Sequence, residues 1–520
     1  MNAPPHSRRL SRPSGPGAGW ALGSILVFAL ALRLAAIFLF PSINHPDETF
    51  QLFEPAHQLA FGWGVKTWEF YDGIRSMVAP AILAVVFRLA EPVVGGPQGY
   101  IDAARMALAL LSLLPVAFIW RLGARESRVH AFLASLVAAA WFEIVYFAIR
   151  PLTEALACDF ALTALALASR PWRDLSFRTL AGIGLCLALT VLLRLQLAPG
   201  AALVAIAVGR LQIRRCWAPM LAGAVPALVV FGAADWLTWG APFASDFRSV
   251  AINLGAGKAS VYGVEPWNWY ARVVAAIWGP FVLPVVALAA VRWRRSNLWI
   301  GFAVVELAVH SLIPHKEYRF VYPALAALVV TAALGSADLV VRFGPRIRGI
   351  RPAWLTAAVA GAWLLTSLTL AAAPEYRDEW RLVGGVIESE YWLSRQPRLC
   401  GVLFYGVQWT ETGGYAFLHR RAPLYFPIYA LVLDHQGAVV WPADYQARRR
   451  LVRQASGAYD FVVATPSSVA AFRPEFSPAR CFGSGVDAVC VLVRPGGCQP
   501  GLWPSILEVR RLGEPLGLRH

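Results

Sequence analysis

Long apolar segments that alternate with short polar ones dominate the first 375 residues of the chain. The first of them, residues 19–40, is as long as a helix that crosses the hydrocarbon core of a bilayer. Each of the later runs contains at most two charged residues. The pattern predicts eleven membrane-spanning helices, at residues 19–40, 101–120, 130–149, 152–169, 179–196, 198–212, 217–238, 268–291, 297–314, 320–341 and 353–374.

Arginines gather in six of the polar segments that flank these runs. The clusters are Arg8, Arg9 and Arg12; Arg121, Arg125 and Arg128; Arg170, Arg173 and Arg178; Arg210, Arg214 and Arg215; Arg292, Arg294 and Arg295; and Arg342, Arg346, Arg348 and Arg351. Loops rich in Arg and Lys normally stay in the cytoplasm. If all six clusters lie there, the chain crosses eleven times and has its N-terminus inside and its C-terminus outside.

One apolar segment, residues 76–94, does not fit this count as a crossing. If it crossed, the cluster at residues 121–128 would lie outside, and every later cluster would also change sides. We therefore predict an interfacial or re-entrant helix that returns to the outer face. The alternative is an ordinary span with one additional crossing elsewhere.

The character of the chain changes after about residue 375. Short apolar runs that are typical of strands alternate there with polar, helix-like stretches. We predict a small α/β domain outside the membrane at residues 375–520, a membrane domain at residues 19–374 and a disordered cytosolic tail at residues 1–18. Four cysteines, Cys400, Cys481, Cys490 and Cys498, suit an oxidising compartment. Cys481 could pair with Cys490 or with Cys498, or these thiols could remain free.

Composition supports a polytopic membrane protein. The chain is 58% apolar and 15% charged, with a mean hydropathy of +0.53. Soluble domains carry about 25% charged residues. The net charge of +16 comes from separated clusters, whereas a nucleic-acid-binding protein would gather its basic residues on one face. We therefore expect no nucleic-acid partner.

Unusual polar residues are concentrated in loops that the topology places on one face, at residues 41–75, 239–267 and 314–320, with a smaller contribution from 150–154. Pro46 can start a helix, and acids at its first positions are favoured by the helix dipole. Asp47 at the membrane edge could accept a proton from a sugar hydroxyl, with Glu48 as its closest helper. The alternative is that Asp47 only caps the helix.

The third loop is cationic. His315, Lys316 and Arg319 lie within five residues, and such a group suits a lipid phosphate. The alternative is that these side chains simply reach toward the interface. Arg33, inside the first run, is either another residue that reaches the interface or a member of the same phosphate pocket.

Three motifs carry a resemblance to a known family. HPDETFQLFEPAHQLAFGWGVKTWEFYDGIRSMVAP begins at residue 45, VYGVEPWNWY spans 261–270 and HKEYRFVYP spans 315–323. In order and spacing they resemble the glycosyltransferase family 22 mannosyltransferases, especially the branch that adds the third mannose of GPI anchors and the lumenal dolichol-linked-oligosaccharide enzymes. Glu265 and Asn268 stand where that family usually has histidines, and LRLQLAPG (193–200) departs from its R-P-T-A.

The resemblance implies a GT-C fold and an inverting transfer of mannose from a polyprenyl-phosphate-mannose donor to a lipid-linked glycan acceptor, on the non-cytosolic face. Asp47 would be the base. No cofactor and no metal are expected, and the membrane would be the bacterial inner membrane or, in a eukaryote, the endoplasmic reticulum. The predicted substrate-binding residues are His45, Gln51, Glu54, Trp68, Glu69, Arg75, Tyr262, Trp267, His315, Lys316 and Arg319.

Two alternatives remain open. A related GT-C enzyme for another sugar would use the same carboxylate and cations. A transporter or flippase of lipid-linked sugars would place its polar residues at the middle of the membrane in broken helices. The uninterrupted apolar runs favour the enzyme, and the sequence leaves the acceptor undetermined.

Overall fold

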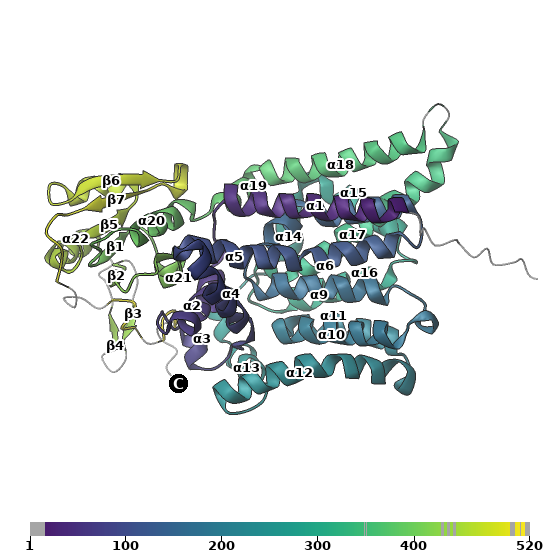
Figure 1. Ribbon diagram of the computed structural model, residues 1–520, viewed down its shortest axis with the longest axis horizontal. Helices are drawn as coiled ribbons and strands as arrows, with labels where there is room; N and C mark the ends of the chain where they lie inside the picture. Colours follow the sequence, from purple (N-terminus) through teal and green to yellow (C-terminus); the bar gives the residue numbers. More distant parts are fainter. Residues whose placement is uncertain are drawn as a thin grey trace, which may run out of the picture.

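The computed structural model describes residues 16–347, 349, 351–427, 431–433, 437–439, 444–499, 505–509 and 511–514. It consists of a bundle of long helices that run alongside one another and a smaller domain with a β-sheet at one end of the bundle (Figure 1). Residues 1–15 of the predicted N-terminal tail (1–18) lie outside the described residues. The first helix begins at Pro16, so it includes the last three residues of that predicted tail.

A helix occupies each of the eleven predicted spans. The bundle helices are α1 (Pro16–Leu39), α5 (Gly96–Leu111), α6 (Leu113–Gly123), α7 (Arg128–Ala140), α8 (Phe142–Phe147), α9 (Thr153–Ala168), α10 (Phe177–Leu193), α11 (Ala198–Gly209), α12 (Ala218–Trp239), α14 (Trp269–Trp278), α15 (Val282–Val291), α16 (Asn297–Leu312), α17 (Tyr318–Phe343) and α18 (Pro352–Ala372). Within the described residues, six helical stretches are long and apolar enough to cross a membrane. The structure therefore confirms a helical membrane body, while eleven crossings stay a prediction.

Small residues let the bundle helices pack closely. A side chain in place of Gly184 on α10 or Gly223 on α12 would collide with the backbone of the other helix. Lipid tails provide no hydrophobic drive between helices, so this kind of close packing holds them together. Arg33 is fully buried in the bundle, where it donates to Ser112 Oγ and to the carbonyl of Ala139. Arg33 therefore does not extend to the membrane–water interface, which was one of the two interpretations of this residue in the sequence.

Short helices cover the end of the bundle that faces the sheet domain. They include α2 (Glu54–Phe61), α3 (Trp68–Tyr71), α4 (Val78–Val94) and α13 (Ala244–Val250) (Figure 1). Helix α4 packs on α2 and α5. Its outward face bears Ile82, Val85, Leu89 and Val93, all more than half exposed, as a helix in contact with lipid would. An interfacial helix and an additional crossing would both present such a face, so the predicted interfacial helix stays a prediction.

The C-terminal domain is a mixed α/β fold, as the sequence predicts. Its five-stranded sheet has the order β2-β1-β5-β7-β6, with β1 parallel to β2 and β5 and with β7 antiparallel to β5 and β6. The strands are β1 (Val402–Tyr405), β2 (Leu424–Tyr425), β5 (Phe461–Ala464), β6 (Ser477–Phe482) and β7 (Val489–Val493); a separate hairpin joins β3 (Leu431–Leu433) and β4 (Gly437–Val439). Helices α19 (Pro374–Arg377), α20 (Gly384–Ser394), α21 (Gly414–Leu418) and α22 (Tyr445–Gln454) complete the domain.

Two disulfides close this domain. Cys481 on β6 pairs with Cys490 on β7, its cross-strand neighbour. This is the first of the alternatives that the sequence left open. Cys400 pairs with Cys498 across 98 residues, which joins the start of β1 to the segment after β7.

The domain docks on the first polar loop through α21. Both carboxylate oxygens of Glu54 accept backbone N–H groups, from Val65 at 2.8 Å and from Ala416 at 2.8 Å. His57 Nδ1 faces the Trp63 carbonyl at 2.9 Å, and His57 Nε2 lies 2.9 Å from His419 Nδ1. A neutral His57 would donate from Nδ1 to the Trp63 carbonyl and accept at Nε2 from His419 Nδ1. The interface therefore depends on the protonation of His57.

Acidification should weaken this interface. Burial above all lowers the pKa of His57 to about 3, whereas an unfolded histidine titrates near 6.5. Below pH ~6.5 the unfolded chain takes up a proton that the folded protein cannot, so stability is full above this pH and is lost as the pH falls toward 3. Between pH 7.5 and 5.0 this effect of His57 amounts to about 2 kcal/mol.

The measurement is the apparent melting temperature in detergent at pH 7.5 and 5.0. His57→Phe keeps an aromatic ring and removes the titration, so its melting temperature should fall less on acidification than that of the unchanged protein. Equal falls in the two proteins would contradict this assignment.

Candidate active site

The three predicted outer loops meet at the end of the bundle that carries the C-terminal domain. Trp239 Nε1 donates to the carbonyl of Arg75 at 3.0 Å, and Lys316 Nζ donates to the carbonyl of Glu265 at 3.0 Å. Arg319, at the start of α17, reaches Asp47. The predicted convergence of these loops is therefore confirmed.

An arginine with three acidic partners occupies the centre of this region. Arg319 Nη2 lies 2.6 Å from Asp47 Oδ2, Arg319 Nε lies 2.5 Å from Glu317 Oε2, and Arg319 Nη1 lies 3.3 Å from Glu154 Oε1. Arg194, which follows α10, also pairs with Glu154, at 3.1 Å. The side chains of Arg319 and Glu154 are buried, while Asp47 and Glu317 keep about a fifth of their side-chain surface exposed. The group is thus open to solvent on its acidic side only.

Neighbouring charges keep Asp47 ionised. Burial alone would raise the pKa of Asp47, but Arg319 and His45 outweigh it and hold this pKa well below the ordinary value. The same balance, with Arg319 and His315 as the main opposing groups, holds the pKa of Glu317 far below its ordinary value. Hydrogen bonding to Glu317, ahead of the opposing effect of burial, raises the pKa of His315. The exposed side of the site therefore presents two carboxylates at neutral pH.

Two histidines complete this cluster. His45 lies between the two exposed carboxylates, with Nδ1 3.4 Å from Asp47 Oδ1 and Nε2 3.3 Å from Glu317 Oε2. His315 Nε2 lies 3.0 Å from Glu317 Oε1. Both histidines were predicted from the sequence as substrate-binding residues; both contact Glu317, and His45 also contacts Asp47.

Glu48 does not share this position. Its side chain is fully buried, pairs with Arg150 at 3.2 Å and accepts the backbone N–H of Asn44 at 2.7 Å. Adjacent residues on a helical turn point in different directions, so Asp47 can face the site while Glu48 faces the protein. The predicted catalytic helper role of Glu48 is therefore corrected: Glu48 anchors the loop to the start of α9.

A second acid–base pair lies beside Asp47. Glu69 Oε1 accepts from Arg75 Nη2 at 2.6 Å and from Gln51 Nε2 at 3.3 Å. The pKa of Glu69 is raised, first by burial and then by the charge of Asp47, against the opposing effect of Arg75. The predicted residues Gln51, Glu69 and Arg75 therefore form one group that is electrostatically coupled to the central cluster.

Several other predicted substrate-binding residues serve the architecture of the loops. Glu54 is fully buried against backbone N–H groups, as described above, so substrate contact is excluded and the prediction is corrected. Lys316 is buried and donates to the carbonyls of Ile313 and Glu265. Two backbone carbonyls already occupy this ammonium group, so a phosphate would have to displace one of them, and the predicted phosphate contact stays a prediction.

The predicted aromatic residues lie at different depths. Trp68 is buried beneath Lys258, whose Nζ lies 3.8 Å from the ring centre. Tyr262 is half exposed, and its hydroxyl donates to the carbonyl of Gly513 at 3.1 Å. Trp267 is 74% exposed and lies free to contact a ligand or the membrane interface.

A segment near the C-terminus straps these loops together, and nothing in the sequence pattern indicated it. Arg511 pairs with Asp72 at 2.7 Å, and Glu514 pairs with Lys258 at 3.3 Å. Leu512 forms a parallel β-bridge with Thr67. Residues 511–514, which we call the C-terminal strap, therefore hold the first and second loops against each other.

Glu154 and Arg194 were also absent from the predicted site. Glu154 ends the short RPLTE segment, and Arg194 follows a long apolar run. The sequence did offer one signal for these two residues, which is a charged residue directly at the end of an apolar helix. Burying such a charge near the membrane costs free energy unless it is paired, so its position indicates an ion pair or a site.

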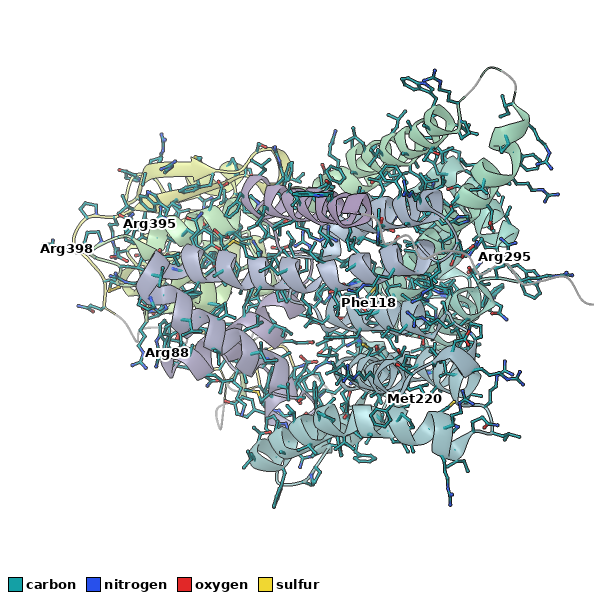
Figure 2. All side chains as sticks on the ribbon, turned by 45° about the vertical axis from the view of Figure 1, so that its right-hand side comes forward. Arg88, Phe118, Met220, Arg295, Arg395 and Arg398 are labelled. Atoms are coloured by element: carbon teal, nitrogen blue, oxygen red, sulfur yellow. A yellow bond between two sulfur atoms is a disulfide. The ribbon has the colours of Figure 1, made fainter. Side chains whose placement is uncertain are left out.

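One further group in the described part of the chain has the geometry of a metal site. Glu126, His130 and Asp338 place one ligand atom each within 4.8 Å of one another. Arg292 already contacts both acids, at 2.5 Å and 3.0 Å, so the carboxylates have cationic partners without an ion. Figure 2 shows Arg295, which also pairs with Asp338, at the end of the bundle away from the candidate site.

Comparison with known proteins identifies the family. The model of the Alg9-like mannosyltransferase family matches residues 24–375. GPI mannosyltransferase 3 of Yarrowia lipolytica is 26% identical over 419 residues, which cover 78% of this chain and 76% of that protein. The Drosophila melanogaster protein of the same name is 28% identical over 68% of this chain and 66% of its own length. GPI alpha-1,2-mannosyltransferase 3 of Homo sapiens is 26% identical, over 59% of this chain and 56% of its own.

Solved structures agree on the fold. ArnT from Cupriavidus metallidurans, in a crystal structure with bound undecaprenyl phosphate, superposes with a TM-score of 0.53 at 14% identity, over 91% of this chain and 98% of ArnT. The apo form of ArnT gives a TM-score of 0.55. Together with the family match across the membrane domain, these findings show that the chain belongs to the Alg9-like mannosyltransferase family and is a multi-pass membrane glycosyltransferase of the GT-C fold.

Proposed function

We propose that this enzyme transfers mannose, with inversion, from a polyprenyl-phosphate-mannose donor to a lipid-linked glycan acceptor on the non-cytosolic face of the membrane, with Asp47 as the general base. The observation that carries the proposal is the ionised, partly exposed Asp47 held 2.6 Å from the buried Arg319 at the centre of the converging loops. The reaction needs a carboxylate that can take a proton and a cation that can bind a phosphate, which Arg319 would do in exchange for one of its carboxylate partners.

The reaction is a single displacement. The acceptor hydroxyl oxygen attacks C1 of mannose on the face opposite the phosphate while Asp47 takes the hydroxyl proton. The bond between C1 and the phosphate oxygen breaks, and its electron pair leaves with the polyprenyl phosphate. Attack from the opposite face, with no covalent sugar–enzyme intermediate, inverts the configuration at C1.

The pairing with Arg319 couples donor binding to the strength of the base. Without donor, Arg319 and His45 hold the pKa of Asp47 very low, which makes it a weak proton acceptor. A donor phosphate near Arg319 would share the charge of the guanidinium and so raise the pKa of Asp47. Asp47 would become a competent base only once the leaving group is in place.

The surroundings fit a lipid-linked donor. Trp236 and Leu237, at the end of α12 close to Arg75, are 64% and 85% exposed, so apolar surface borders the site where a polyprenyl chain could lie. In one of its crystal structures, ArnT is bound to undecaprenyl phosphate. The names of the curated relatives point to a mannosylated glycolipid related to GPI precursors as the acceptor class.

An assay with purified protein tests the proposal. Polyprenyl-phosphate mannose and a panel of mannosylated lipid acceptors should give a product that is longer by one mannose, with an α linkage from a β-linked donor. Transfer from a nucleotide-activated mannose in place of the lipid donor would contradict the proposal.

The sidedness follows from the arginine clusters and has its own test. Alkaline phosphatase, which is active only outside the cytoplasm, should be active when fused after residue 376 and inactive when fused after Arg295. An inactive but stably expressed fusion after residue 376 would place the C-terminal domain, and with it the candidate site, in the cytoplasm.

A further inference from the structure

A cavity lies at the arginine-rich end of the bundle, opposite the candidate active site. It has a volume of about 710 Å³ and lies between the end of α9, α11 and the start of α16. Its lining residues are Ala168, Ser169, Arg170, Pro171, Arg173, Leu175, Leu203, Ala207, Val208, Arg210, Arg295, Asn297, Leu298, Trp299 and Gly301. None of these belongs to the candidate active site.

The polar rim of the cavity is cationic. It carries Arg170, Arg173, Arg210 and Arg295, and no acidic residue is among the lining residues, all of which the structure describes. Arg170 Nε is buried and lacks a hydrogen-bond partner in the described structure. Arg125 Nη1 is in the same situation, and the pKa of Arg125 is lowered to about 10 by burial and by the like charge of Arg170. No acidic residue among the lining residues balances Arg170, Arg173 and Arg210, so the rim suits an anion.

The inner walls are apolar. Leu203, Ala207 and Val208 come from α11, and Leu298 and Trp299 come from α16. A soluble anion such as inorganic phosphate would make no favourable contact with these apolar walls. An amphiphile would bury an acyl chain there while its head group meets the arginines.

The adjoining loop also carries features of a lipid contact. Leu211 and Ile213 are 94% and 73% exposed beside Arg210, Arg214 and Arg215. Exposed apolar side chains interleaved with arginines suit a segment that lies in the head-group region of a membrane with anionic lipids. This composition suits a cavity mouth at the depth of phospholipid head groups.

We propose that this cavity, which we call the arginine pocket, binds one anionic phospholipid of the leaflet opposite the active site. The phosphate lies among Arg170, Arg173 and Arg210, and an acyl chain lies between α11 and α16. The site is separate from the one where the donor lipid is proposed to react.

The test is native mass spectrometry of the delipidated full-length protein titrated with phosphatidylglycerol or phosphatidylcholine. The unchanged protein should bind one phosphatidylglycerol in preference to phosphatidylcholine. The double variant Arg170→Gln and Arg210→Gln should bind phosphatidylglycerol roughly tenfold to thirtyfold more weakly, because each basic residue near an anionic head group contributes measurably to binding.

Two further variants keep the test decisive. Arg342→Gln with Arg346→Gln removes the same charge outside the lining residues and should leave binding unchanged. Ala207→Trp leaves every arginine in place but fills the apolar part, and it should also weaken binding. Three outcomes would each overturn the proposal. The first is an equal loss of binding in the Arg342 and Arg346 control, and the second is unchanged binding in both pocket variants. The third is full competition by millimolar inorganic phosphate.

Discussion

Replacing Asp47 by asparagine is expected to leave a folded protein whose kcat is lower by roughly 10²–10⁴-fold, the usual contribution of a general base. The asparagine keeps the shape of the side chain, and no cap is lost because Asp47 makes no capping hydrogen bond, but the asparagine cannot accept the proton of the acceptor hydroxyl. The variant should still bind the lipid donor, because Arg319 and Arg194 remain. The measurement is single-turnover mannose transfer at saturating donor.

The control for this experiment is Glu48→Gln. Glu48 is the adjacent carboxylate, but it is buried against Arg150, so its loss should act through stability and leave kcat of the folded fraction within a few-fold of normal. The acid limb of the kcat/KM profile adds an independent check. Since the pKa of Asp47 is held below its ordinary value, activity should persist to lower pH than an ordinary aspartate would allow. Near-normal turnover of Asp47→Asn would remove Asp47 from the mechanism.

Arg319→Gln should raise the KM for the lipid donor by about ten- to a hundredfold, because a charge-assisted hydrogen bond to phosphate contributes roughly 1.5–3 kcal/mol. The structure adds a second consequence. Arg319 is the shared partner of Asp47, Glu154 and Glu317, so its removal leaves three neighbouring carboxylates with less positive charge between them. Their pKa values should rise, and the apparent melting temperature should fall on going from pH 5 to pH 8.

The comparison variant is Arg377→Gln. This arginine is largely exposed and pairs only with its neighbour Asp378 in the described structure, so KM and melting behaviour should not change. His315→Ala offers an intermediate case, since His315 contacts Glu317 and not Arg319 directly. An unchanged donor KM in Arg319→Gln would assign this arginine to structure alone.

The apolar pattern predicted the helical body well, because membrane helices are encoded locally in runs such as residues 353–374. It also predicted that three distant loops meet, since topology alone brings outward loops to one face. The direction in which individual side chains point was harder to predict from the sequence. Asp47 and Glu48 are adjacent acids of the same motif, yet one faces the site and the other faces Arg150. That difference depends on which side of a helical turn each residue occupies.

Individual residue contacts between segments far apart in the chain could not be predicted. Arg194 reaches the site only because the end of α10 lies beside Glu154. Glu54 was placed among the substrate-binding residues by the family resemblance. Its true surroundings are set by α21 of the C-terminal domain, more than 350 residues later in the chain. Nothing in the local sequence of residues 45–76 indicates which domain will cover it.

The C-terminal strap has a consequence for how the protein is made. Its contacts fasten Thr67, Asp72 and Lys258 to residues 511–514. A chain emerging from the ribosome can therefore insert all its membrane helices long before those loops acquire their final fastening. Transfer activity should appear only late in biosynthesis, after the C-terminal domain has folded, which would keep half-made molecules from acting on membrane glycolipids.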